Sequence, residues 1–183
     1  MFESLLGRIA RELDQRAIPY MVIGGQAVLV YAEPRFTRDI DITLGVGPDR
    51  LDDILGLALD CAWKVLVDPA RPFVEKHMVL PCEESSGIRI DLIFSFSPYE
   101  AQALERVRRI EMDGQNVRFA SPEDLVVHKV IAGRARDLED VASVLRMNPG
   151  SDLAYIRHWL GVFSRDLGRS YVERFEETLR RSE

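Results

Sequence analysis

Two aspartates in one short segment, Asp39 and Asp41, have the residue type and spacing that could perform chemistry. They alternate with isoleucine over residues 39–42, which is the period of a strand with one polar face. On such a strand both carboxylates project from the same face, with their Cα atoms about 6.5 to 7 Å apart. A divalent cation would offset their mutual repulsion, and carboxylate oxygens suit magnesium or manganese. The segment therefore predicts a cation site, although an exposed edge strand of alternating polarity would show the same pattern.

A third carboxylate, Asp91, lies in the otherwise strongly apolar segment 87–94. An unpaired carboxylate in a buried strand is costly, so Asp91 requires a partner. If its strand pairs beside the strand of Asp39 and Asp41, three carboxylates meet at one site. Such a site can hold two Mg²⁺ or Mn²⁺ ions, which is the arrangement that drives phosphoryl and nucleotidyl transfer.

Gly24 and Gly25 separate a predicted buried strand, residues 20–23, from a predicted helix that begins at Gln26. A glycine pair at this position lets backbone amides approach a triphosphate, and the helix directs its positive end at the same anion. A pair of glycines by itself is also typical of an ordinary tight turn. Taken together with the carboxylates, the pair favours a phosphate site over a bare edge strand.

Helical and strand patterns alternate along residues 1–120, whereas helices alone follow them. The helices expected in the first part span residues 2–16, 26–31 and 49–60, with a short one after residue 98. The strands expected there span residues 20–23, 39–44, 63–67, 73–80, 88–94, 107–112 and 116–119. Ser121 and Pro122 then start a helix, and helices continue to the end with one break at residues 148–150. We therefore predict an α+β fold, with a mixed or antiparallel sheet flanked by helices in residues 1–120 and a helical bundle in residues 121–183.

The composition describes a compact folded chain without a segment that could cross a membrane. The 183 residues are 46% hydrophobic and 30% charged, and the longest apolar runs fall far short of the roughly 20 residues that a span needs. We expect a cytoplasmic protein with no membrane partner. The net charge of −6 neither identifies nor excludes a nucleic-acid partner. Cys61 and Cys82 predict neither a disulfide framework nor a metal cluster.

The order of these elements resembles the signature of the polymerase-beta-like nucleotidyltransferase superfamily. Residues 23–25 are apolar, Gly, Gly; thirteen residues later, residues 39–42 read Asp, apolar, Asp, apolar. Asp91, in its apolar strand, resembles the third carboxylate of that superfamily. The segment 35–38 is similar to the basic, hydroxyl-bearing segment that precedes the acidic pair in bacterial members.

The resemblance implies transfer of a nucleoside monophosphate from an NTP to a hydroxyl acceptor, with two Mg²⁺ or Mn²⁺ ions as cofactors. It implies that Asp39, Asp41 and Asp91 are at once the metal ligands and the catalytic residues. Gly24 and Gly25 would then bind the triphosphate.

Basic side chains just before the acidic pair are further candidates for contacts with the nucleotide. The resemblance implies that Arg38 or Arg35 contacts phosphate, and a solvated arginine is an equally good interpretation for each. Sequence does not choose among the four NTPs.

A second resemblance concerns the helices after the core. Residues 121–125, Lys129, residues 136–137 and residues 140–141 look like the helical motif of the abortive-infection (AbiEii) and minimal nucleotidyltransferase toxin-like proteins. That branch implies a toxin-antitoxin or abortive-infection toxin, with tRNA or a protein as acceptor and an antitoxin protein as partner.

Within that motif, Lys129 would face the active site and bind phosphate, unless it lies on a solvated helix face. Asp137 and Asp140 we interpret as structural, pairing with Arg134 or Arg136 across a helix turn.

Two other functions fit the same residues. One is a nucleotidyltransferase that modifies a small molecule such as an antibiotic, since enzymes of that class share the glycine pair and the acidic pair. The other is a catalytically lapsed nucleotide-binding module, against which the three intact aspartates argue.

Overall fold

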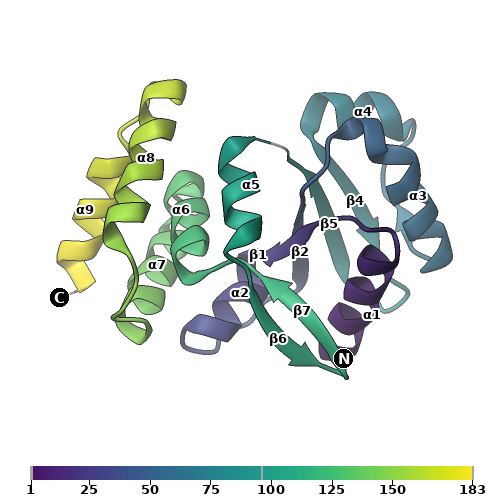
Figure 1. The fold of residues 1–183 in the computed structure, drawn as a ribbon, viewed down its shortest axis with the longest axis horizontal. Coiled ribbons are helices and arrows are strands. Elements are labelled where there is room, and N and C mark those ends of the chain that lie inside the picture. The colour runs from purple at the N-terminus through teal and green to yellow at the C-terminus, as the bar shows by residue number, and fades with distance from the viewer. Residues whose placement is uncertain (1, 96, 183) are drawn as a thin grey trace. The chain divides into compact units, whose positions relative to one another are not determined.

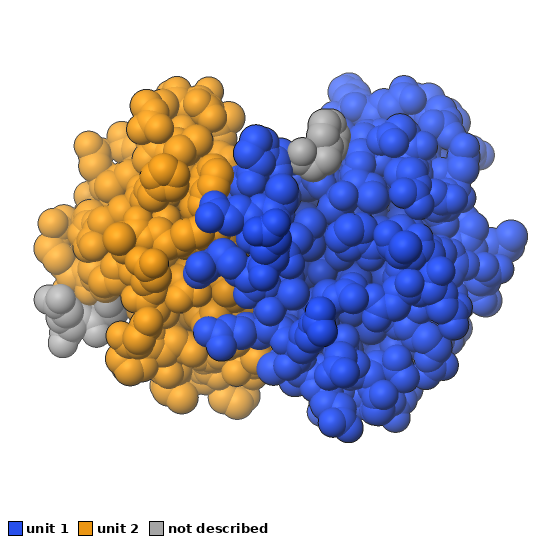
Figure 2. Space-filling model, in the orientation of Figure 1, with its two compact units in different colours: residues 1–26, 37–119 blue, residues 27–36, 120–183 orange. Residues whose placement is uncertain are grey.

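The structure is a computed structural model that describes residues 2–95 and 97–182. The chain forms two compact units, coloured separately in Figure 2. The first unit contains residues 1–26 and 37–119, and the second contains residues 27–36 and 120–183. The sequence predicts one division near residue 120; in the structure, residues 27–36 also belong to the second unit.

The first unit is built on a mixed seven-stranded sheet with the order β3-β4-β5-β2-β1-β7-β6 (Figure 1). Its strands are β1 (Tyr20–Ile23), β2 (Asp39–Leu44), β3 (Lys64–Val65), β4 (Val79–Glu83), β5 (Arg89–Phe94), β6 (Arg108–Met112) and β7 (Gln115–Phe119). The pairs β2–β5 and β1–β7 are parallel, and the other neighbouring strands are antiparallel.

Alternation along the central strands gives the sheet a buried apolar face and a polar face. On β2, Ile40 and Ile42 are fully buried. Asp39 and Asp41 alternate with them on the polar face, where Asp39 is exposed and Asp41 is half-buried. On β5, Ile90 and Leu92 are likewise buried. The helices described in this unit are α1 (Phe2–Gln15), the 3-10 turn η1 (Pro48–Arg50), α3 (Leu51–Asp60), α4 (Ala70–His77) and α5 (Pro98–Glu105).

The second unit is helical. Its helices are α6 (Pro122–Ala132), α7 (Ala135–Met147), α8 (Leu153–Leu167) and α9 (Tyr171–Ser182). Helix α6 is its central element, since it packs against α7, α8 and α9 and buries most of its residues. Ser121 caps α6 as expected, because its hydroxyl accepts a hydrogen bond from the Asp124 amide at 3.1 Å. Helix α2 (Gly24–Tyr31) begins in the first unit and continues into the second.

The structure confirms the predicted α+β class, with a mixed sheet flanked by helices and a helical C-terminal part. The predicted strand over residues 73–80 is wrong. Its first half is the end of α4, and Met78, in the left-handed conformation at φ 58°, separates that helix from β4. Residues 73–77 thus belong to a helix and residues 79–80 to a strand.

The glycine pair also differs in detail from its prediction. Gly24 and Gly25 are the first two residues of α2 and not a separate turn before it. Among the described helices, none is long and apolar enough to span a membrane.

Candidate active site

The three candidate carboxylates lie on neighbouring strands of the first unit. The predicted pairing of their strands is confirmed, because β2 and β5 are parallel neighbours with Asp41 in register with Asp91. The same register sets Asp39 beside Arg89. Neighbouring strands lie about 4.8 Å apart and paired residues project from the same face, so these four side chains form one charged group on the sheet. Asp39 is exposed, and Asp41 and Asp91 are half-buried.

The start of helix α2 adjoins this group through strand β1. Ile23, the last residue of β1, pairs with Asp41, and Gly24 follows directly. Gly24 has φ +64°, and a Cβ atom built on it would lie 2.0 Å from Oδ2 of Asp41. A Cβ atom on Gly25 would lie 2.2 Å from Oγ1 of Thr37. Both glycines are therefore positions of close approach, where any side chain would displace a neighbouring polar group.

Gln26, the third residue of α2, is a site residue that the sequence patterns do not single out. Its side chain is only 4% exposed, and its Nε2 atom has no hydrogen-bond partner among the described residues. A buried amide usually has one, so the unsatisfied donor makes Gln26 a candidate for contact with a ligand. A polar residue directly after the glycine pair, ahead of the apolar residues 27–30, is the signal that could have identified it.

The partner that Asp91 requires is Arg89. Nε of Arg89 lies 2.9 Å from Oδ1 and 3.1 Å from Oδ2 of Asp91. This hydrogen bond, together with the charges of Asp39 and Asp41, raises the pKa of Arg89 although partial burial opposes the shift. The two residues are two apart on β5 and so share a face, a pattern visible in the sequence.

The candidate ligands of the site fit a hard divalent cation in their chemistry. All three candidate ligands are carboxylates, and the absence of a side chain at Gly24 lets the Asp41 carboxylate lie against the start of α2. Within residues 2–95 and 97–182, no group of three or more His, Cys, Asp and Glu side chains is arranged as a metal-ligand set. Asp91 in this structure binds Arg89 instead.

Lys129 lies in the second unit, within a network of buried charges. Its ammonium group lies 2.9 Å from Oδ1 of Asp137 and 2.8 Å from Oδ2 of Asp140. Its side chain is only 8% exposed, so the alternative of a lysine on a solvated helix face is wrong. Arg35 binds both carboxylate oxygens of Asp140, at 2.7 and 2.8 Å, and is not a solvated side chain either. The network connects α6 and residues 27–36 to α7. A contact between Lys129 and phosphate stays a prediction.

The predicted pairing of Asp137 with Arg134 is confirmed, at 2.7 Å, whereas Asp140 pairs with Arg35 and Lys129. Burial would raise the pKa of Asp137, but hydrogen bonds from Arg134 and Lys129 outweigh it and hold that pKa below the ordinary value of an aspartate. Asp137 is therefore ionised at neutral pH and forms ion pairs with both Lys129 and Arg134.

Arg38 is exposed and immediately precedes Asp39, so the chain itself keeps it near the carboxylates. Arg136 donates a hydrogen bond to the carbonyl oxygen of Phe36 at 2.9 Å. Contact between Arg38 and phosphate stays a prediction.

The two cysteines of the first unit, and a hollow on its surface, do not belong to this site. Cys61 and Cys82 are both free and buried. Burial, with a smaller contribution from the Asp91 charge, raises the pKa of Cys82 to about 12, so its thiol is protonated and unsuited to metal binding.

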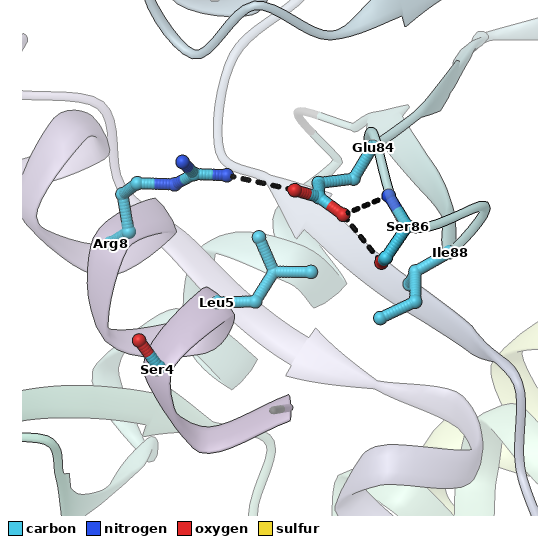
Figure 3. A pocket seen from close by; sticks show the side chains of 6 residues that line it. All are labelled: Ser4, Leu5, Arg8, Glu84, Ser86 and Ile88. Carbon is cyan, nitrogen blue, oxygen red and sulfur yellow. Dashed lines mark hydrogen bonds and ion pairs between the residues drawn. The ribbon is translucent and has the colours of Figure 1, made fainter.

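A hollow of about 280 Å³ lies between α1 and the β4–β5 turn (Figure 3). Glu84 stands in it between Arg8, at 3.6 Å, and the Ser86 amide, at 2.7 Å. Hydrogen bonds from Ser86 lower the pKa of Glu84 to about 2. Its carboxylate is therefore already satisfied by the residues around it.

Solved structures with the same fold include enzymes that modify antibiotics. The solution structure of the antibiotic-resistance factor ANT(2'')-Ia has a TM-score of 0.63 at 14% identity, with 91% of this chain and 94% of that chain covered. A nucleotidyltransferase-like protein from Paracoccidioides brasiliensis has a TM-score of 0.58 at 15% identity, covering 97% of this chain and 91% of that one. The lincosamide antibiotic adenylyltransferase LnuA, with lincomycin bound, has a TM-score of 0.52 at 14% identity, covering 74% and 91%. With sequence identities this low, the structural similarity shows a shared fold alone.

Comparison with curated protein sequences gave no match. The sequence model of one family, by contrast, matches residues 4–149, which contain the glycine pair, the three aspartates and helices α6 and α7. The chain therefore belongs to the family described as nucleotidyltransferase of unknown function (DUF6036).

Proposed function

We propose that this chain transfers a nucleoside monophosphate from an NTP to a hydroxyl acceptor, in a reaction that depends on Mg²⁺ or Mn²⁺. The observation that carries the proposal is the register of β2 and β5, which sets Asp41 beside Asp91 on the face that also carries Asp39. A second carboxylate-bearing strand at that register is what a cation-assisted phosphoryl site needs. Family membership supports the reaction class.

Each residue of the site has a role that its position supports. Asp39, Asp41 and Asp91 would hold the divalent cations, which when bound supply charge stabilisation for the phosphate groups and lower the pKa of the acceptor hydroxyl. Gly24 and Gly25, which carry no side chain of their own, would let the first amides of α2 approach the triphosphate. Asp91 would also accept the proton of the acceptor hydroxyl.

Positive side chains would complement the triphosphate. Arg38 is exposed beside Asp39, and its fixed positive charge suits a phosphate oxygen. Lys129 would reach phosphate only by giving up Asp137 or Asp140, so we assign Arg38 the stronger part of this role.

The acceptor belongs to one of two classes. The helical motif within residues 121–141 supports the AbiEii or minimal nucleotidyltransferase toxin-like branch, with tRNA or a protein as acceptor. The fold shared with ANT(2'')-Ia and LnuA supports a small-molecule acceptor such as an antibiotic.

Labelled nucleotides distinguish these possibilities. We would incubate the chain with each NTP, labelled at the α- or the γ-phosphate, with Mg²⁺ and with tRNA, cell lysate protein, tobramycin or lincomycin in turn. Nucleotidyl transfer puts the α-label on one acceptor and releases the γ-label. Absence of labelling with every acceptor would favour a lapsed nucleotide-binding module.

An aspartate variant ties the labelling to the site. Asp41→Asn removes one ligand charge, and we expect transfer to fall by about a thousandfold, since cation stabilisation of this kind is worth several kcal/mol. Asp49→Asn is the matched control, because Asp49 is exposed and follows the other end of β2. Equal transfer by the two variants would contradict the assignment of Asp41.

A further inference from the structure

Arg89 is a positive charge placed inside the group of candidate metal ligands. Across β2 and β5 the register forms two rows, Asp39 with Arg89 and Asp41 with Asp91. Three carboxylates and one guanidinium give this group a formal charge of −2, which a single divalent cation would balance. A fixed cation among metal ligands would ordinarily oppose metal binding, so the presence of Arg89 requires an explanation.

The contact itself gives that explanation. Nε of Arg89 is within 3.1 Å of both carboxylate oxygens of Asp91. A metal ion bound by Asp91 needs the lone pairs of these same oxygens, and an N–H donor and a cation compete for them. We propose that Arg89 occupies Asp91 in place of a divalent cation, sets the metal affinity of the site, and is displaced when the cation binds.

Displacement of Arg89 is feasible because the pair is accessible. Its side chain is 51% exposed, and that of Asp91 is 20% exposed. Ion pairs this exposed are weak and are screened by solvent, so a divalent cation can outcompete them. Glu83 on β4 is in register with Arg89 from the other side and presents a second carboxylate on the same face. The guanidinium can therefore leave Asp91 without losing every acidic neighbour.

The proposal rests on the proposed function only in needing a cation at Asp91, so its test measures metal binding without nucleotide or catalysis. Binding of Mn²⁺ to the full chain, followed by electron paramagnetic resonance, gives a Kd for the wild type and for four variants: Arg89→Gln, Arg89→Lys, Arg50→Gln and Asp41→Asn. Arg50 is the matched control, because it is also ion-paired, with Asp53, but lies in the 3-10 turn that follows the opposite end of β2. Thermal unfolding verifies that each variant is folded.

We expect Arg89→Gln to tighten Mn²⁺ binding by about tenfold, since it replaces the competing guanidinium with a shorter, uncharged amide and so removes a nearby like charge. Arg89→Lys, which keeps the charge, and Arg50→Gln, which removes a distant one, should stay within about twofold of the wild type on the same scale. An unchanged Kd for Arg89→Gln would overturn the proposal while leaving the metal site intact. Equal tightening by Arg89→Gln and Arg50→Gln would overturn it in favour of a general charge effect.

Asp41→Asn separates failure of this proposal from failure of the proposed function. Weak or absent binding by Asp41→Asn alone supports the site at the carboxylates. If neither the wild type nor Arg89→Gln binds Mn²⁺, both the proposed metal dependence and the role of Arg89 are refuted.

Discussion

Replacing Gly24 with alanine perturbs the backbone and the candidate site at one position. The φ angle of +64° places Gly24 in the left-handed region, and its missing Cβ atom would lie 2.0 Å from Oδ2 of Asp41. An alanine there therefore has two separable costs. One is strain in its own backbone, and the other is displacement of the Asp41 carboxylate.

Both costs can be estimated. A residue other than glycine in the left-handed region costs about 1 to 2 kcal/mol. For a chain of this size that corresponds to a fall in Tm of about 2 to 8 °C. Contacts of a Cβ atom closer than 3.0 Å are essentially never tolerated, so Oδ2 of Asp41 must withdraw by about 1 Å. Misplacement of a catalytic group by about 1 Å costs on the order of a hundredfold in rate.

Gly168→Ala supplies the matched control. Gly168 has φ +61°, and a Cβ atom built on it would meet nothing within 4 Å. Both variants should lose similar stability by differential scanning calorimetry. Only Gly24→Ala should lose nucleotidyl transfer, by about a hundredfold in kcat/KM with α-labelled NTP. Transfer by Gly24→Ala within about threefold of Gly168→Ala would refute the placement of Asp41 in the active site.

The buried network of the second unit gives the remaining predictions. Lys129→Met leaves two buried carboxylates without a shared partner, and we expect a loss of about 3 kcal/mol in the free energy of unfolding measured by urea titration. Lys76→Met, at an exposed lysine on α4, should change it by less than about 0.5 kcal/mol, and an equal effect would contradict the network's role. The pKa of Asp137 is lowered in the folded state, so its contribution to stability is present above its unfolded pKa and is lost as pH falls through the folded pKa. The Tm difference between the wild type and Asp137→Asn should accordingly be constant above about pH 5 and shrink below pH 3.8, and a difference that grows on acidification would contradict this sign.

Local patterns predict the central part of the fold because each signal lies within a few residues. Alternation over residues 39–42 specifies β2 and its polar face, and the apolar neighbours of Asp91 specify β5. Ser121 and Pro122 mark the start of α6 for the same reason. The boundary between α4 and β4 was not predictable in this way, because apolar residues flank the polar residues 75–77 on both sides and the separating residue, Met78, adopts an uncommon backbone conformation.

Contacts between distant residues account for most of what the sequence does not reveal. Arg35 and Asp140 are 105 positions apart, so no local period connects them. In the sequence, Lys129 looks like any lysine on a helix. Only the packing of α6 against α7 shows that its side chain is buried. Arg89 is the exception. Its two-residue separation from Asp91 on one strand already places both side chains on the same face.

Anomalous diffraction from crystals of the chain soaked with Mn²⁺ and a non-hydrolysable NTP analogue tests the central claim most directly. We predict a manganese peak within about 2.2 Å of oxygens of both Asp41 and Asp91, with the triphosphate at the first amides of α2. Arg89 should no longer bind Asp91 in that structure. A manganese peak away from these carboxylates, or a triphosphate bound away from Gly24 and Gly25, would contradict the account.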